Sequence, residues 1–341
     1  MNDTVAGGIA ASNADESGAP LLSINALNVY FKRSGGGEVK VVEDLSLDIG
    51  RSEVVGIAGE SGCGKSVTAY SVMGILPKSA RMAGAVTFDG TNLQTVGAET
   101  LRRLRGRRMA MVFQEPMTSL NPVLTIGYQI AEVLTTHKGM SMREAMDEAA
   151  RLLSEVKIPE ARRRVHDYPH QFSGGMRQRV MIAMAMACGP ALLIADEPTT
   201  ALDVTIQSRI LALLRATVEK NRMSMLLITH DLGIIAENTQ RAAVMYAGRI
   251  MEQTGTAELF RNPLHPYTIG LLESLPKGRG VPLRPIAGIV PRPGELPVGC
   301  KFSNRCAHGI ARCVEEEPAL GDMGGGHFVR CHRAGEVLWE C

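Results

Sequence analysis

Gly59-Glu60-Ser61-Gly62-Cys63-Gly64-Lys65-Ser66 reads G-x-x-x-x-G-K-S, and it stands between an apolar run at residues 53–58 and a helix-like stretch at residues 67–73. This order predicts a strand, a loop and a helix. Glycines let backbone N–H groups converge on phosphate oxygens, and the helix points its positive end at the same anion. Lys65 would bring charge to the outer phosphates, and Ser66 would offer a hydroxyl to Mg²⁺. The stretch therefore predicts a nucleotide-binding loop rather than an ordinary glycine-rich turn.

Length and composition describe a globular chain with a core domain and a smaller addition. The chain has 341 residues, of which 45% are apolar and 21% charged, with a net charge of +2. Single hydrophobic cores rarely grow beyond about 250–300 residues. Two basic runs, at residues 102–108 and 162–164, are interpreted as solvated faces, and no nucleic-acid partner is expected.

Neither the polar N-terminal stretch nor the most apolar stretch of the sequence predicts a membrane-spanning segment. Residues 1–20 are small and polar without a basic start, which predicts a disordered tail rather than a secretory signal. The most apolar stretch, residues 180–195, is interrupted by Gly189-Pro190 and is too short to cross a bilayer. We expect a buried helix before this interruption, a buried strand after it, and a protein that is cytosolic or attached to a membrane through partners.

Hydrophobic periodicity predicts an α/β fold with a parallel core. Leu45, Leu47 and Ile49 alternate with polar residues, as in a half-buried strand. Further strands are expected at residues 109–113, 192–195, 223–228 and 243–246, the last forming a hairpin with residues 250–253. Between residues 125 and 188 the spacing is helical, which predicts a helical insertion between two core strands.

Two carboxylates follow the apolar run Leu192-Leu193-Ile194-Ala195. A buried strand would deliver Asp196 to the metal side of the phosphates, where it can hold Mg²⁺ through water. Glu197, one residue later, would polarise the water that attacks the γ-phosphate. Two solvated acids at a strand end are the alternative, which the phosphate loop upstream makes much weaker.

A second anion-binding turn lies at Ser173-Gly174-Gly175, where a helix is expected to begin. Backbone N–H groups at a helix N-terminus bind phosphate in the same way as the first loop. One domain does not easily fold both sites onto one phosphate, so a second copy of the domain would have to supply one of them.

This turn resembles the signature loop of ABC-type ATPases, usually written L-S-G-G-Q, and the remaining family motifs follow in order. Gln114 corresponds to the Q-loop residue, Ala201-Leu202-Asp203 to the D-loop and His230 to the switch histidine, while Phe31 would stack on adenine, with Tyr30 as its near neighbour. The resemblance covers residues 21–335. It implies an ABC nucleotide-binding domain with a RecA-like core, an antiparallel β subdomain and a helical subdomain.

The resemblance also implies the domain boundaries and the role of each site residue. The ABC ATPase domain would span residues 21–262, with the helical subdomain at about 115–188, and a cysteine-rich C-terminal domain would span residues 263–341. By role, the implied residues are Phe31, Gly59, Glu60, Ser61, Gly62, Cys63, Gly64, Lys65, Ser66, Gln114 and Asp196 for ATP; Ser66, Gln114 and Asp196 for Mg²⁺; Ser173, Gly174, Gly175 and Asp203 for the ATP of a partner subunit; and Glu197 and His230 for catalysis. Phe172 and Met176 depart from the usual leucine and glutamine of the signature, and we expect an altered helix start rather than an inactive site.

Two further segments resemble the oligopeptide, dipeptide and nickel importers. Residues 114–122 extend the Q-loop in the manner of these proteins, and residues 262–268 contain the His-Pro-Tyr-Thr element that opens their C-terminal extension. The resemblance implies a "D"-type ATPase subunit that energises uptake of peptides delivered by an extracytoplasmic solute-binding protein. Its partners would be two membrane permeases and a second, related but non-identical ATPase subunit, and its place the cytoplasmic face of the inner membrane.

Other functions remain as alternatives. The same ATPase could serve an importer of nickel, glutathione or another small solute, because selection lies in the partners. A DNA-repair ATPase of the same superfamily would insert a long heptad-rich coiled coil, which the sequence lacks. An ABC protein of translation would carry two cassettes in one chain, and no second phosphate loop follows residue 66. An iron–sulfur redox enzyme is a further class, which co-purification with permeases would distinguish.

The tail contains five of the seven cysteines, and four of them, Cys300, Cys306, Cys313 and Cys331, are spaced C-x5-C-x6-C-x17-C. Disulfides are not expected in the cytosol, and structural zinc usually uses close C-x2-C pairs. A [4Fe–4S] cluster, which the family resemblance favours, accepts four thiolates from a compact tail. Unligated thiols and zinc remain as alternatives. Cys341 is interpreted as spare, Cys188 as a small apolar residue, and His308 and His332 as solvated.

Overall fold

Two β-sheets and a layer of helices make up the structure, a computed structural model that describes residues 18–33, 35–115, 119–200, 202–276 and 285–337. The expected tail at residues 1–20 lies outside this part, apart from its last three residues, as does Cys341. The strands are β1 (Leu22–Lys32), β2 (Glu38–Ile49), β3 (Val54–Ala58), β4 (Ala80–Phe88), β5 (Thr91–Asn92), β6 (Met109–Val112), β7 (Leu192–Asp196), β8 (Ser224–Thr229), β9 (Arg241–Tyr246), β10 (Arg249–Gly255), β11 (Gly321–Asp322) and β12 (Phe328–Val329).

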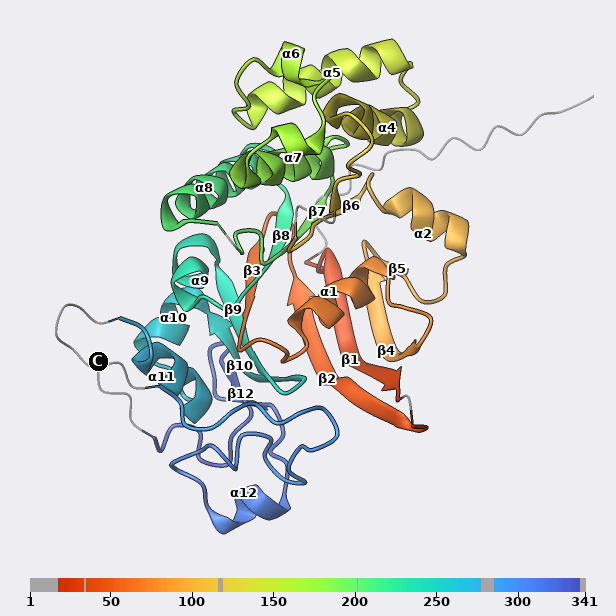
Figure 1. The fold of residues 1–341 in the computed structure, drawn as a ribbon. Helices are drawn as coiled ribbons and strands as arrows, with labels where there is room; N and C mark the ends of the chain where they lie inside the picture. Colours follow the sequence, from red (N-terminus) through yellow and green to blue (C-terminus); the bar gives the residue numbers. More distant parts are fainter. Residues whose placement is uncertain (1–17, 34, 116–118, 201, 277–284, 338–341) are drawn as a thin grey trace, which may run out of the picture.

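The larger sheet has the order β11-β12-β10-β9-β3-β8-β7-β6 (Figure 1). Its five strands from β9 to β6 are parallel, with register pairs such as Ile57↔Ile228 and Ala195↔Leu227. Every residue of β6, β7 and β8 is buried, as parallel strands covered on both faces require. The parallel α/β core predicted from the apolar runs is therefore confirmed. So is the hairpin of β9 and β10, in which Tyr246 pairs with Arg249.

The smaller sheet is antiparallel, with the order β2-β1-β4-β5. Along β2 the last residues alternate between exposed and buried, so Leu45, Leu47 and Ile49 face inward as their spacing predicts. These side chains join one buried cluster with Ile57 of β3 and Val72 of helix α1 (Lys65–Met73). The antiparallel sheet thus packs onto the parallel core beside the helix that follows the glycine-rich loop (Figure 1).

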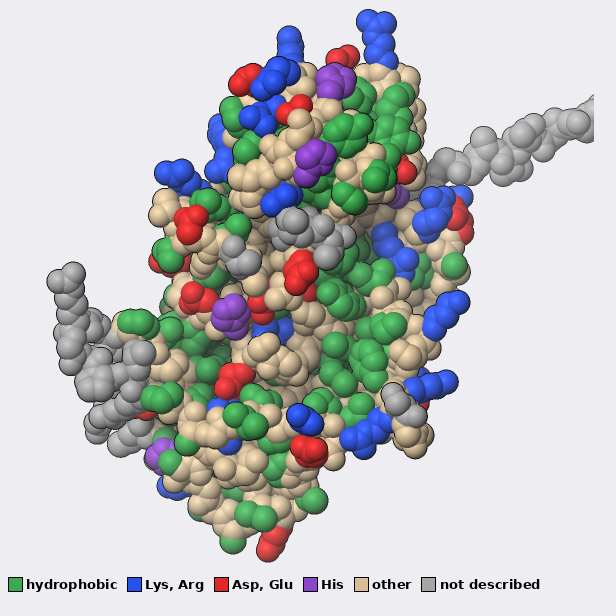
Figure 2. Space-filling model, in the orientation of Figure 1, with side chains coloured by type: hydrophobic (Ala, Val, Ile, Leu, Met, Phe, Trp, Pro, Cys, Tyr) green, Lys and Arg blue, Asp and Glu red, His purple; other side chains and the backbone are tan. Residues whose placement is uncertain are grey.

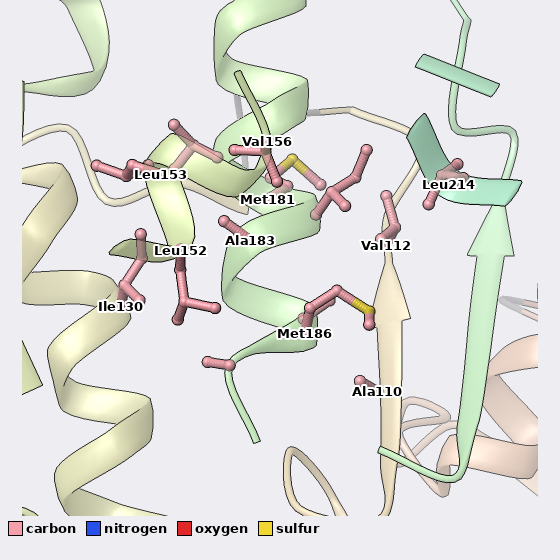
Figure 3. Close-up of a cluster of buried hydrophobic side chains, with 14 of the residues drawn as sticks. Ala110, Val112, Ile130, Leu152, Leu153, Val156, Met181, Ala183, Met186 and Leu214 are labelled. Atoms are coloured by element: carbon pink, nitrogen blue, oxygen red, sulfur yellow. The ribbon is translucent and has the colours of Figure 1, made fainter. Parts of the chain in front are cut away.

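A helical layer covers the end of the parallel sheet at β6, where the helical spacing predicted an insertion. Its helices are α4 (Ile126–Lys138), α5 (Met142–Glu155), α6 (Ala161–Arg164) and α7 (Gly174–Met186). Ser141 and Glu144 form a reciprocal capping box that fixes the start of α5. Figure 3 shows Leu152 and Leu153 of α5 facing Ala183 and Met186 of α7, with Val112 of β6 beyond them. This buried cluster holds the layer to the sheet.

The remaining helices accompany the sheet strands and the C-terminal part. They are α2 (Ala98–Leu104), α8 (Val204–Lys220), α9 (Leu232–Asn238), α10 (Thr256–Arg261), α11 (Pro266–Glu273) and α12 (Ala311–Glu315). None of the helices in the described ranges is long and apolar enough to cross a membrane. Figure 2 shows Lys and Arg side chains distributed over several parts of one face, with Asp and Glu among them.

The C-terminal extension is joined to the parallel core through the sheet and through aromatic packing. Val329 of β12 pairs with Glu252 of β10, so the extension continues the larger sheet. Tyr246 of β9 lies 4.7 Å from Tyr267 of α11 and 5.3 Å from Phe302, between ring centroids. All three rings are buried. Contacts of this kind resist independent movement of the extension.

Candidate functional site

The glycine-rich loop leaves β3 and ends at α1, as its position in the sequence predicts. Gly59 has a positive φ, and a Cβ built there would lie 2.1 Å from the backbone oxygen of Met245, so only glycine fits. Gly64, at the helix N-cap, has φ 105° and no side-chain cap. The N–H groups of the first turn of α1 are thus directed into the loop without a competing side chain. This is the geometry of a phosphate-binding loop.

Lys65 is buried at the mouth of this loop, with 5% of its surface exposed. Its Nζ donates hydrogen bonds to the backbone oxygens of Gly59 (2.7 Å) and Glu60 (3.0 Å). The nearest carboxylate oxygen is Oε1 of Glu197, at 3.9 Å. The ammonium is therefore held between the loop and the strand that ends at Glu197, where the outer phosphates of a nucleotide would lie.

Ser66 and Asp196 form a site that fits Mg²⁺. The Ser66 hydroxyl donates to Oδ1 of Asp196 at 3.0 Å, which joins the start of α1 to the end of β7. Asp196 is fully buried, and its Oδ2 has no hydrogen-bond partner in the described part of the chain. A buried acceptor without a partner is expensive unless something binds it. Since Mg²⁺ prefers oxygen ligands and is usually held by one or two protein groups plus phosphates, this pair fits it.

Burial makes the ionised form of Asp196 costly in the nucleotide-free chain. Burial raises the pKa of Asp196 from 3.8 to about 6, with Glu197 adding a smaller push in the same direction, while Ser66 and Lys65 oppose the shift. Because the pKa is higher in the folded state, protonation favours folding. That stabilisation is complete below the unfolded-state pKa near 4 and is lost as the pH rises through 6.

Asp196→Asn should therefore stabilise the metal-free chain at pH 7. A pKa shift of this size corresponds to about 1–3 kcal/mol in the free energy of unfolding. Thermal unfolding at pH 7 and at pH 4.5 measures it: the gain should be present at pH 7 and should shrink at pH 4.5. Asp147→Asn, on the exposed face of α5, is the control. An unfolding midpoint at pH 7 that falls, or that matches the control, would contradict this interpretation.

The Glu197 carboxylate contacts polar side chains from several parts of the site. Its Oε2 accepts hydrogen bonds from Gln114 Nε2 at 3.2 Å and from Thr200 Oγ1 at 2.8 Å, and lies 3.2 Å from Nδ1 of His230. The Glu197 side chain is 11% exposed and that of His230 59%. Glu197 also has a φ of 44°, rare for a residue with a side chain. Two separate segments, at Gln114 and His230, thus meet this carboxylate beside Lys65, together with Thr200 of its own turn.

Thr200 is a contact that sequence reasoning missed. It lies three residues after Glu197, and its N–H donates to the backbone oxygen of Glu197 at 3.2 Å, which closes a turn. Only this turn brings the Thr200 hydroxyl back to the carboxylate. A threonine after two acids gives no distinctive signal in the sequence.

The signature turn begins α7, in the helical layer. Ser173 is the N-cap of α7 and its Oγ accepts from the N–H of Met176. A Cβ on Gly175 would lie 2.7 Å from Ile206 of α8, so the turn packs closely on that helix. The Met176 side chain packs on the buried cluster of the helical layer, which accounts for an apolar residue at this position. Phe172 is also buried, beneath the guanidinium of Arg164 at 5.5 Å.

Asp203 caps the neighbouring helix rather than the nucleotide loop. Its Oδ1 accepts from the N–H of Ile206 at 2.9 Å, at the start of α8. In the described part of the chain, no hydrogen bond or ion pair joins Asp203 or Ser173 to the loop at residues 59–66. Ala201, between them, lies outside the described residues. Within the described part of one chain, the Ser173 turn is thus not held against that loop by a hydrogen bond or an ion pair.

The two aromatic residues near the end of β1 have different surroundings. Phe31 is half-buried and packs against the cluster that contains Cys63. Tyr30 lies under the guanidinium of Arg81, 4.0 Å from the ring centroid. Because successive strand residues point to opposite faces of a sheet, Phe31 and Tyr30 do not share the same surroundings. The ring of Tyr30 already has the Arg81 guanidinium as its partner.

The four tail cysteines converge. Cys300, Cys306, Cys313 and Cys331 all line one small cavity, together with Phe302 and His265. All four are free thiols. Burial raises the pKa of Cys300 to about 12 and also raises those of Cys306 and Cys331, so these thiols are protonated when unligated. No group of three or more His, Cys, Asp or Glu among the described residues is placed to hold a metal ion, so the expected metal centre lacks that support.

Comparison with known proteins identifies the family. Residues 42–200 match the ABC transporter family, and residues 251–313 match the C-terminal region of oligopeptide/dipeptide transporters. The oligopeptide transport ATP-binding protein OppD of Salmonella typhimurium is 45% identical over 330 residues, which cover 96% of this chain and 98% of the relative. OppD of Escherichia coli is 44% identical over 327 residues, covering 95% and 96%.

A solved structure confirms the fold. The dimeric structure of an ATP-binding cassette in a post-hydrolysis state, bound to ADP and phosphate, superposes with a TM-score of 0.62 at 26% identity, over 69% of this chain and 98% of that one. The α/β nucleotide-binding fold expected from the resemblance is thus confirmed. With two family regions matched in order and relatives of this identity over nearly its whole length, the chain belongs to the ABC transporter family of ATP-binding subunits, in its oligopeptide/dipeptide branch.

Proposed function

We propose that this chain is the ATP-hydrolysing subunit of a membrane importer that takes up di- and oligopeptides. One observation of the site carries the catalytic part: Glu197 lies beside Lys65 and accepts hydrogen bonds from Gln114 and Thr200. The relatives named for oligopeptide transport, matched over almost their whole length, support the transport part. The domain boundaries expected from the sequence, 21–262 for the ATPase and 263–341 for the extension, belong to this proposal.

The reaction is the attack of water on the γ-phosphate of ATP, giving ADP and phosphate. Backbone N–H groups of residues 59–64 and the Lys65 ammonium hold the phosphates, and Phe31 stacks on adenine. Ser66, Asp196 and Gln114 would hold Mg²⁺, which would supply positive charge to neutralise the phosphate oxygens. Glu197 orients the water and accepts its proton, and His230, more than half exposed, reaches the γ-phosphate. The reaction requires little covalent chemistry from the protein, so the main contribution of the protein is to position the water and the phosphates.

The Ser-Gly-Gly turn acts on a second nucleotide. Ser173, Gly174 and Gly175 lie at the start of α7 in the helical layer, and Asp203 lies at the start of α8; among the described residues, no hydrogen bond or ion pair joins them to the loop at residues 59–66. A partner subunit would bring its own loop to this turn, so that two ATP molecules are each held between two subunits. The dimeric cassette structure bound to ADP and phosphate is a precedent for such pairing. ATP then favours the paired state because it binds that state better.

The complete importer would contain further proteins. Two permeases, a related but non-identical second ATPase subunit and an extracytoplasmic solute-binding protein are the partners we propose, with this chain on the cytoplasmic face of the inner membrane. Pairing of the ATPase subunits would be transmitted to the permeases through the Gln114 loop and the helical layer. Nickel, glutathione or another small solute is the alternative cargo.

Reconstitution in proteoliposomes tests this function. The assembled importer should hydrolyse ATP faster when a peptide-loaded binding protein is supplied, and should accumulate labelled peptide only with ATP. Nickel and glutathione, offered in the same vesicles, should not be accumulated. Uptake of either of them in place of peptide would replace the proposed cargo, and absence of any ATP hydrolysis would contradict the proposed function itself.

We also propose that the tail cysteines hold a [4Fe–4S] cluster. Their convergence on one cavity supports this, since all four thiols line it. Thiolates bound to four different irons lie farther apart than thiolates on one ion, so the lack of a single-ion site among the residues that the structure describes is compatible with a cluster. Binding would require the four thiols to lose their protons. Such a centre would supply either rigidity to the tail or a one-electron couple.

Cys306→Ser should remove most of this iron. Protein purified without oxygen should be brown, should absorb visible light through thiolate–iron transitions, and should contain about four irons per chain. Cys188→Ser, a thiol outside the cavity, should retain the colour and the iron. Zinc in place of iron would favour a zinc site, and metal-free protein would favour unligated thiols; either result would overturn the cluster.

A further inference from the structure

Glu60, the second residue of the phosphate-binding loop, is held by the C-terminal extension rather than by its own domain. Its carboxylate accepts two hydrogen bonds from the Arg305 guanidinium, 2.7 Å from Nη1 to Oε2 and 3.1 Å from Nη2 to Oε1. Its backbone N–H donates to the hydroxyl of Tyr267 at 3.0 Å. The carboxylate and the backbone N–H of Glu60 are therefore both held by residues outside the ATPase core.

Arg305 is itself immobilised. Only 3% of its side chain is exposed, against 31% for Glu60. Its Nε donates to the backbone oxygen of Ala287 at 2.9 Å, and its guanidinium lies 5.7 Å from the Tyr246 ring centroid and 5.9 Å from that of Phe302. A planar guanidinium with paired donors and aromatic neighbours holds a carboxylate in one geometry.

Arg305 also stands between two of the cavity cysteines. It precedes Cys306, and its N–H donates to the backbone oxygen of Phe302, in the turn that begins at Cys300. Phe302 and Cys306 both line the cysteine cavity. The position of the guanidinium is thus set by the same turn that places two of the four thiols.

We propose that Arg305 and Tyr267 are positioning residues for ATP binding: the C-terminal extension holds Glu60 and thereby shapes the phosphate-binding loop. This inference rests on the proposed ATPase function and concerns the same site. Its physical reason is twofold. The Tyr267 hydroxyl orients the Gly59–Glu60 peptide unit, whose own carbonyl and the next one along the chain accept hydrogen bonds from Lys65. Arg305 neutralises a carboxylate that would otherwise repel the triphosphate.

Arg305→Met should raise the KM for ATP of the assembled importer about tenfold, with kcat changed by no more than about twofold, since uniform binding is lost. Arg312→Met is the matched control. Arg312 also precedes a cavity cysteine and makes a bidentate bond, but its partner is Glu316 of the extension and its side chain is 60% exposed. This control should leave KM unchanged, and equal KM values for the two variants would overturn the proposal.

Glu60→Gln separates positioning from a general effect on folding. In the Glu60→Gln background there is no carboxylate to neutralise, so Arg305→Met should raise KM by no more than about threefold. A full tenfold rise in that background would show that Arg305 acts through something other than Glu60, and would overturn the proposal.

Two further variants keep the test decisive. If Arg305→Met unfolds below the assay temperature, Arg305→Lys replaces it. Lysine retains the positive charge but lacks the paired donors of the guanidinium, so this variant should raise the KM for ATP about threefold. An unchanged KM would contradict the proposal. Tyr267→Phe should raise the KM by a similar factor. A parental importer without any ATPase activity would instead contradict the proposed function; titration of the full-length chain with MgATP would then still compare the affinities.

Discussion

Glu197→Gln is expected to retain MgATP and to lose hydrolysis, with kcat reduced by about 10²–10⁴-fold in the assembled importer. Glutamine matches glutamate in size and can still accept hydrogen bonds from Gln114 and Thr200 through its oxygen. The fold of the site should therefore survive. What is lost is the anionic base that orients water and accepts its proton.

Two measurements check this expectation. Single-turnover kinetics should show the slow chemical step, and a MgATP titration should give an affinity within about threefold of the parental value. The variant should also accumulate the paired state of the ATPase subunits, because ATP that favours pairing is no longer consumed. Glu219→Gln, an exposed carboxamide substitution on α8, should behave as the parent does. Hydrolysis by Glu197→Gln at the parental rate would show that Glu197 is not the base.

Ser173→Arg is the second substitution with a large expected effect, a loss of more than about 100-fold in ATP turnover by the assembled importer. Ser173 is exposed and is the N-cap of α7, whose positive end lies at this residue. A long side chain at this position would occupy the space that a partner's triphosphate needs. The loss should appear in kcat, since the turn contributes to the paired state in which hydrolysis occurs.

Ser173→Ala is the control for this substitution. It removes only the hydroxyl that accepts from Met176, a helix cap worth about 1 kcal/mol. Its unfolding midpoint should fall slightly, while turnover should decline by much less than in Ser173→Arg. Equal losses in the two variants would mean that the cap, and not the space beside it, accounts for the effect.

The parts of the site that lie within one short segment could be predicted from the sequence. The glycine-rich loop, the strand ending at Asp196 and the helix beginning after Ser173 each have a local pattern, and the structure places each as expected. The alternation of Leu45, Leu47 and Ile49 likewise fixed the buried face of β2, because strand periodicity is a local property.

Contacts between distant segments could not be predicted in this way. Arg305 and Glu60 are 245 residues apart in the chain, and nothing in either segment indicates the other. The pairing of β12 with β10 is also missing from the sequence pattern, because β12 has only two residues and no periodicity. Thr200 reaches Glu197 only because the chain turns back after β7. Each of these depends on packing that a single segment does not encode.

The central claim is that the Ser173 turn serves the nucleotide of a partner and not that of its own chain. A MgATP titration of the isolated chain carrying Ser173→Arg tests it most directly. If the turn acts on the partner's nucleotide, the affinity of the isolated variant should equal that of the parental chain within about twofold. A fall of tenfold or more in that affinity would place the turn on the chain's own phosphates, and would contradict the shared site on which the proposed mechanism depends.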